Sequence, residues 1–179
     1  MRYDVYKCFI PECFLDTNLV ELIFEKTGVV NHKKGNSSVL AAMQSDKLKD
    51  NFAVAIIDDD KVKVKALEEF NLNVRLSKVG LKIYKHPLRA HFVIQLSPAI
   101  EQWILRECAK AEVNMGNYGL EDNLETLRKM KAITQRSDER FKRLFREMMQ
   151  CSSCDEIIEL KRWLIFLKDN NYNTDLDLL

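Results

Sequence analysis

Along the chain, apolar runs of strand length alternate with segments in which hydrophobic residues recur every three or four positions. The first run, residues 3–10 (YDVYKCFI), is rich in aromatic and β-branched side chains and predicts a strand that ends at the first proline. In residues 14–28, Leu15, Leu19 and Ile23 fall on one face of a helix. The chain is therefore expected to open with a strand, a tight turn and a helix.

The middle of the chain continues this alternation. Residues 29–32 are short but compatible with a strand, and a second helix is expected after them. The run NFAVAII, residues 51–57, is apolar over the length of a strand, as expected for a parallel strand covered on both faces. Another strand is expected at residues 91–96 (HFVIQL), followed by a helix with Ser97 as its cap and Pro98 at its first position. This order predicts a doubly wound α/β fold with a mostly parallel central sheet and helices on both faces.

The remaining segments extend this prediction. Residues 74–84 contain one or two further strands, and the pattern from residue 120 onward is helical. We therefore expect an α/β domain over residues 1–112 and a helical extension over residues 113–179 that packs on the same domain. Two apolar stripes identify the packing faces of the extension, at Phe141, Leu144, Phe145 and Met148 and at Ile157, Leu160, Leu164 and Leu167.

Composition narrows the class of protein. A chain of 179 residues with 46% hydrophobic content can bury one core of ordinary size. Its 28 Lys and Arg residues nearly balance its 27 Asp and Glu residues, so the net charge of +1 provides no long-range attraction to nucleic acid or to a membrane surface. No apolar run approaches the roughly 20 residues that span a bilayer, and the amino terminus lacks a signal-peptide pattern. We expect a cytoplasmic protein with no membrane partner.

The five cysteines, in a chain without a secretion signal, favour reduced thiols over a disulfide framework. Cys151 and Cys154 form CSSC, a spacing that zinc knuckles and redox centres also use. A zinc site would need two further ligands, and the histidines lie far away with no ligand spacing. The structural alternative is that Ser153 caps a helix and Glu156 completes a capping box.

Acidic residues follow two of the predicted strands. Glu12 comes just after the first strand, and Asp58, Asp59 and Asp60 come directly after the apolar run that ends at Ile57. The carboxyl ends of adjacent parallel strands meet at one edge of an open α/β sheet, about 5 Å apart. Because alternate side chains of an extended segment point the same way, Asp58 and Asp60 are expected to face Glu12 while Asp59 points elsewhere.

Carboxylates held this close need a counter-charge. Two unit charges roughly 4 Å apart repel by about 4 kcal/mol at an effective dielectric of about 20. Mg²⁺ or Mn²⁺ suits such a set of hard oxygen ligands, and a proton or a nearby lysine such as Lys61 is the alternative. Aspartate runs are also common in turns, where the side chain binds backbone amides.

Two segments of the chain resemble the Toprim domain of topoisomerases, primases, OLD-type nucleases, recombination mediators and small RNA-maturing nucleases. They are FIPECFLDTNLVE, which contains Glu12, and AVAIIDDDK, which contains Asp58 and Asp60. The resemblance covers roughly residues 3–110 and implies a Toprim-like fold. It also implies that Glu12 acts as a general acid or base in phosphoryl transfer and that the two aspartates bind Mg²⁺. The family usually follows its glutamate with glycine, whereas this chain has Cys13.

Further candidates lie at the same edge of the predicted sheet. Glu101 resembles the position of an additional metal-binding acid in some nuclease-like members of the family, and alternatively it complements the dipole of its helix. For phosphate binding the candidates are Lys61 and the pair Lys33 and Lys34, whose loop HKKGNSS leads into a helix.

These features favour a magnesium-dependent nuclease or a related phosphoryl-transfer protein that acts on DNA or RNA. One alternative is a Toprim-like binding or regulatory module without turnover. Under either reading, the expected partners include nucleic acid and a second copy of the chain or another protein. Another alternative is a phosphoreceiver domain, which also places acids after its first and third strands. That fold prefers an acid pair after the first strand, where this chain has Glu12 followed by Cys13.

Overall fold

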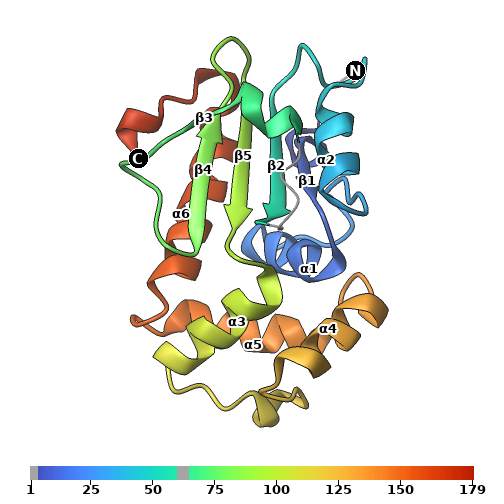
Figure 1. The fold of residues 1–179 in the computed structure, drawn as a ribbon, viewed down its shortest axis with the longest axis vertical. Helices are drawn as coiled ribbons and strands as arrows, with labels where there is room; N and C mark the ends of the chain where they lie inside the picture. Colours follow the sequence, from blue (N-terminus) through green and yellow to red (C-terminus); the bar gives the residue numbers. More distant parts are fainter. Residues whose placement is uncertain (1–3, 60–64) are drawn as a thin grey trace.

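The computed structural model describes residues 4–59 and 65–179. These residues form an α/β fold with a five-stranded sheet and helices on both of its faces (Figure 1). The strands are β1 (Phe9–Pro11), β2 (Ala53–Asp58), β3 (Asn71–Leu72), β4 (Leu81–Lys85) and β5 (His91–Leu96). The α-helices are α1 (Phe14–Ile23), α2 (Asn36–Met43), α3 (Ile100–Lys110), α4 (Leu124–Ile133), α5 (Glu139–Gln150) and α6 (Asp155–Asn170). None of the described helices has the length and apolar content that crossing a membrane requires.

The sheet is mixed, with the strand order β1-β2-β5-β4-β3. Strands β1, β2 and β5 are parallel, β4 is antiparallel to β5, and β3 is antiparallel to β4. The prediction of a mostly parallel sheet is therefore wrong. Only residues 86–90 connect β4 to β5. Because a parallel crossover needs a dozen or more residues, this short connection allows only a hairpin.

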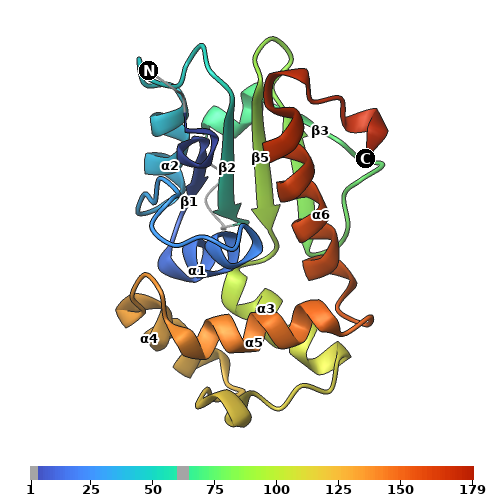
Figure 2. The ribbon, with the colours of Figure 1, turned by 180° about the vertical axis from the view of Figure 1, so that it is seen from behind.

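The two faces of the sheet belong to two hydrophobic cores. Along β2, Val54 and Ile56 face the larger core, and Ala53, Ala55 and Ile57 face the smaller one. The larger core also contains residues of α1, α3, α5 and α6, whereas α2 covers the smaller core. Figure 2 shows α6 along the face of the sheet that belongs to the larger core. This arrangement confirms the prediction of helices on both faces of the sheet.

The carboxyl ends of β2 and β5 point to the same edge of the sheet, and α3, α4 and α5 lie across that edge in both ribbon views (Figures 1 and 2). The segment between α4 and α5 is tied to α1. Arg136 donates hydrogen bonds to the buried carboxylate of Glu21, and Asn18 accepts from the Asp138 N–H and donates to the Gln135 carbonyl. Burial by itself raises the pKa of Glu21, but the bonds from Arg136 lower it below its usual value. These contacts hold α4 over the ends of the strands.

The first strand is shorter than predicted. Residues Val5–Cys8 form a 3-10 helix, and the side chain of Asp4 accepts a hydrogen bond from the Tyr6 N–H at its start. An aspartate that binds the backbone two residues on stabilises a turn at the expense of a strand. Only Phe9–Pro11 pairs with β2.

Residues 29–32 do not form a strand, contrary to the prediction. The N–H groups of Val29 and Val30 donate to the side chain of Glu21 and are therefore not used for strand pairing. The chain nevertheless follows β1, because the Asn31 and Lys33 N–H groups donate to the carbonyls of Phe9 and Pro11.

Both predicted helix starts after residue 96 lie elsewhere. Helix α3 begins at Ile100 with Ala99 as its N-cap, and the Ser97 hydroxyl donates to Asp59. Helix α6 begins after Cys154, so Ser153 is not its cap. Glu156 points inward, and its carboxylate accepts hydrogen bonds from the Gly80 N–H, the Trp103 Nε1–H and the Arg106 guanidinium.

The Glu156 carboxylate thus connects α6 to α3 and to the residue before β4 inside the protein. Replacement Glu156→Ala leaves these donors without their acceptor, and we expect it to lower the free energy of unfolding by about 3–5 kcal/mol. The neighbouring Asp155→Ala is the matched control, because the ion pairs of Asp155 with Lys78 and Lys110 are exposed. Asp155→Ala should lower the free energy of unfolding by less than about 1 kcal/mol. Equal losses in urea denaturation would contradict the inward role of Glu156.

Candidate metal site at the carboxyl edge of the sheet

The strand pairing places the predicted acids at one edge of the sheet. Pro11 of β1 pairs with Ile56 of β2, and the Glu12 N–H donates to the Ile56 carbonyl at 3.0 Å. Asp58 is the last residue of β2 and pairs with Leu96 of the parallel strand β5. The predicted adjacency of the first strand and the apolar strand is therefore confirmed.

One ammonium group lies among three of the predicted acids. Lys131 Nζ is 2.6 Å from Asp58 Oδ2, 3.7 Å from Glu12 Oε2 and 3.6 Å from Glu101 Oε1. The three carboxylates come from the ends of β1 and β2 and from the first turn of α3, and Lys131 comes from α4. Only the contact with Asp58 has the length of a hydrogen bond. We call Glu12, Asp58, Glu101 and Lys131 the edge cluster.

Asp58 is the most constrained member of the edge cluster. It is buried, and its Oδ1 accepts a hydrogen bond from the Ile100 N–H at 2.9 Å, so this aspartate satisfies a donor in the first turn of α3. The Asn36 side chain donates to the Asp58 carbonyl and accepts from the Asp58 N–H. Three hydrogen bonds therefore fix the backbone position and the side-chain direction of Asp58. The remaining oxygen, Oδ2, accepts a hydrogen bond from Lys131.

Asp59 points away from the edge cluster, as predicted. Its carboxylate accepts hydrogen bonds from Lys82 Nζ at 2.7 Å and from the Ser97 hydroxyl at 2.8 Å. These bonds tie the loop after β2 to β4 and to the segment before α3. Asp59 therefore has a structural role beside the cluster.

Two residues that the sequence analysis did not select lie next to the edge cluster. Cys13 is the N-cap of α1 and Asp16 is in its first turn, and both are buried. The Cys13 N–H donates to Asp16 Oδ2 at 3.1 Å, and the Asp16 N–H donates to Cys13 Sγ at 3.5 Å. The sequence contained one signal for this pair, because Cys-x-x-Asp at the start of a helix has the spacing of a capping box.

Burial and mutual repulsion disturb the titration of these groups. Burial raises the pKa of Asp16 well above its usual value, and the negative charges of Asp58 and Glu12 raise it further. Burial also raises the pKa of Asp58, and Lys131 opposes this rise. For Lys131, burial opposes the charged form, but the neighbouring Cys13 and Asp58 raise its pKa above the usual value. Lys131 is therefore the charged counter-ion of the cluster.

The lysine was also missed by the sequence analysis, which sought a counter-charge near the aspartates in sequence. Lys131 is separated from Asp58 by 73 positions. A weak signal exists, because Lys131 follows the buried Leu127 by one helical turn and so shares the inward face of α4.

The acidic side chains of the edge cluster are of the chemical type that binds hard divalent cations. Its three acidic side chains offer carboxylate oxygens, which Mg²⁺ and Mn²⁺ prefer as ligands. Asp60 and Lys61, predicted as a metal ligand and a phosphate ligand, lie outside the described residues. The cluster therefore contains Glu12, Asp58 and Glu101 of the predicted metal and catalytic set.

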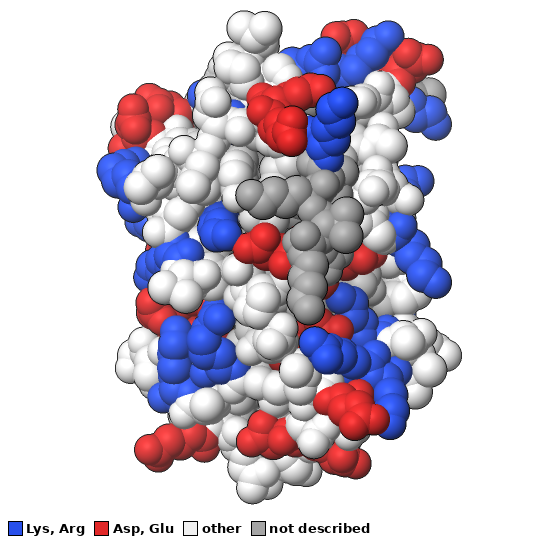
Figure 3. Space-filling model, in the orientation of Figure 1, with Lys and Arg blue, Asp and Glu red and all other residues white. Residues whose placement is uncertain are grey.

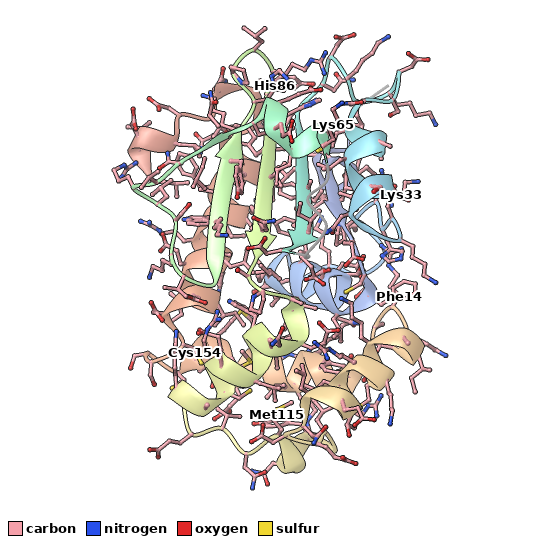
Figure 4. All side chains as sticks on the ribbon, in the orientation of Figure 1. Phe14, Lys33, Lys65, His86, Met115 and Cys154 are labelled. Carbon is pink, nitrogen blue, oxygen red and sulfur yellow. The ribbon has the colours of Figure 1, made fainter. Side chains whose placement is uncertain are left out.

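The other predicted phosphate ligands lie apart from the edge cluster. Lys33 lines a cavity of about 480 Å³ beside β1 together with Lys7 and Lys47, and Lys34 is exposed. Figure 4 shows Lys33 beside α2 and Phe14 at the start of α1. Among the described residues, neither Lys33 nor Lys34 forms an ion pair with an acid of the cluster. On the face shown in Figure 3, acidic and basic side chains are interspersed.

No protein-family model, curated protein or solved structure has a significant match to this chain.

The ion pair of Lys131 gives a stability prediction in the presence of a chelator. Replacement Lys131→Met leaves the buried Asp58 without its counter-charge, and we expect the free energy of unfolding at neutral pH to fall by about 3 kcal/mol. The folded-state pKa of Asp58 is already raised above 3.8, and it rises further without Lys131. Protonation of the folded protein then removes the penalty, so the loss should shrink as the pH falls through this raised pKa toward 3.8.

Lys129→Met is the control on the same helix, because Lys129 forms an exposed pair with Glu125. It should change the free energy of unfolding by less than about 0.5 kcal/mol at any of these pH values. A loss for Lys131→Met that equals the control, or that grows on acidification, would show that Lys131 does not neutralise Asp58.

Proposed function

We propose that this protein is a Mg²⁺- or Mn²⁺-dependent phosphodiesterase that acts on nucleic acid with a Toprim-like site. The observation that carries the proposal is the convergence of Glu12, Asp58 and Glu101 on one point, marked by Lys131 Nζ within 3.7 Å of all three. A place surrounded by carboxylates in a largely buried setting strongly favours positive charge. A divalent cation supplies more of that charge than an ammonium group does.

Each member of the edge cluster then has a role in phosphoryl transfer. Asp58 and Glu101 hold the cation, with Asp60 as a third ligand predicted from the sequence. The bound ion neutralises charge on the phosphate. Glu12 transfers a proton at the phosphoester as a general acid or base. Lys131, displaced from Asp58, is within reach of a phosphate oxygen at the same edge of the sheet.

Basic side chains apart from the edge cluster also support a polyanionic substrate. The cavity beside β1 is lined by Lys7, Lys33 and Lys47, and the backbone of Lys33 is bonded to Pro11, the residue before Glu12. With an overall charge of only +1, attraction has to come from such local groups.

The test is cleavage of labelled single- and double-stranded DNA and RNA with Mg²⁺, with Mn²⁺ and with a chelator. We expect metal-dependent cleavage that Glu12→Gln and Asp58→Asn each lower by at least about 10²-fold, because a proton-transfer group or a metal-binding carboxylate is lost. Asp46→Asn is the control, since Asp46 is an exposed carboxylate that pairs with Lys49. It should leave the rate unchanged. Cleavage that survives the chelator, or that survives both substitutions, would refute the proposed site.

A second candidate function is favoured by the length of one contact. The Lys131 ammonium group, hydrogen-bonded to Asp58 at 2.6 Å, can permanently occupy the place of a metal ion. The protein would then be a Toprim-like binding module without turnover. Such a module predicts association with nucleic acid or protein that Glu12→Gln and Asp58→Asn do not change, and no cleavage in any of the assays above. A phosphoreceiver is not proposed, because its parallel sheet has the order 2-1-3-4-5, whereas this sheet is mixed with the order β1-β2-β5-β4-β3.

A further inference from the structure

A group of three metal-ligating side chains lies at the start of α1, and only one of them belongs to the edge cluster. Glu12, Cys13 and Asp16 each present one ligand atom, and these atoms all lie within 4.8 Å of one another. Bonds of about 2.0–2.3 Å around tetrahedral Zn²⁺ separate neighbouring ligands by roughly 3.5 Å. Small side-chain movements are therefore enough to bring the three atoms onto one ion.

The capping box of α1 does not use all the ligand capacity of this group. Its two hydrogen bonds engage Asp16 Oδ2 and Cys13 Sγ. Asp16 Oδ1 remains, in a fully buried side chain, with no hydrogen-bond partner among the described residues. Such an oxygen is costly to bury, and because its side chain belongs to a group with a thiol and a second carboxylate, a cation is its natural partner.

We propose that Glu12, Cys13 and Asp16 bind a thiophilic divalent transition-metal ion, with Zn²⁺ as the best match. The set combines one sulfur with two carboxylate oxygens, whereas Mg²⁺ takes oxygen ligands and leaves thiolates aside. On binding, the Cys13 thiol and any protonated carboxyl group release their protons to solvent, and the sulfur and oxygens then coordinate the ion. Three protein ligands leave the fourth tetrahedral position open, which is the arrangement of catalytic zinc sites.

This inference goes beyond the proposed function and does not depend on it. The two sites share Glu12, which cannot transfer a proton while it binds Zn²⁺, so the two sites are alternatives at that residue. The site at Lys131 needs only carboxylates, and the site at Cys13 needs sulfur. Cleavage of nucleic acid tests the first site, and a metal-sulfur bond tests the second, so either proposal can fail alone.

The experiment is a titration of the metal-free 179-residue chain with Co²⁺, a spectroscopic substitute for Zn²⁺. Bonding between Co²⁺ and a thiolate gives a charge-transfer band in the near ultraviolet, and we expect this band to saturate at one equivalent. Cys13→Ser should abolish the band and weaken Zn²⁺ binding at least about tenfold. Loss of a residue that only hydrogen-bonds to a metal ligand already lowers metal affinity by about that factor. Asp16→Asn should weaken Zn²⁺ binding as well, and its amide oxygen can still accept the Cys13 N–H of the cap.

The matched control is Cys151→Ser. Cys151 is a partly exposed thiol of the CSSC segment, and Figure 4 shows Cys154 of that segment far from Phe14 at the start of α1. This substitution should leave the band intact. Absence of the band in the unmodified protein, its persistence in Cys13→Ser, or its loss in Cys151→Ser would each overturn the proposal. If Cys13→Ser does not fold, as judged by circular dichroism, Asp16→Asn with an unchanged Zn²⁺ affinity would overturn it.

Discussion

The structure depends on the charge balance between Lys131 and the carboxylates that surround it. Four separate segments meet at this point, namely the residue after β1, the end of β2, the first turn of α3 and the inward face of α4. Like charges at this spacing repel by several kcal/mol unless a cation lies between them. The helical layer over the edge of the sheet therefore has an electrostatic reason to sit where it does, in addition to its hydrophobic packing.

The rest of the fold holds these groups in place from several directions. Asp58 is fixed by Asn36 and by the Ile100 N–H, and the segment after α4 is fixed to α1 through Glu21 and Arg136. Rigid support of this kind lets a site hold charged groups at distances they would not keep in solution. The capping box formed by Cys13 and Asp16 adds further buried polar atoms next to the edge cluster. At this edge of the sheet several charged groups are buried together, and such conflict between burial and charge is typical of functional sites.

The sequence could predict those parts of the fold in which hydrophobic pattern and element length agree. The strand at residues 91–96 has the predicted bounds, and β2 lies within one residue of the predicted end of its apolar run. The meeting of Glu12 and Asp58 follows from the parallel pairing of two strands, which the intervening helices imply. The alternation of strands and helices predicted a mostly parallel sheet, whereas the short connection at residues 86–90 makes β4 antiparallel to β5. The cap of α3 was missed because its acceptor, Asp58, lies on another element.

Lys131 shows why the candidate site could be predicted only in part. Its role depends on how α4 packs across the edge of the sheet, and packing between distant segments leaves little trace in local spacing. Asp16 was overlooked for a different reason, because its hydrogen bonds are those of an ordinary helix cap and only its burial beside other acids sets it apart.

Anomalous diffraction from crystals soaked in Mn²⁺ would test directly whether the edge cluster is a cation site. A peak at about 2.2 Å from carboxylate oxygens of Asp58 and Glu101, with Lys131 moved away from Asp58, is the expected result. Retention of the 2.6 Å bond between Lys131 and Asp58, with no Mn²⁺ at the cluster, would contradict it.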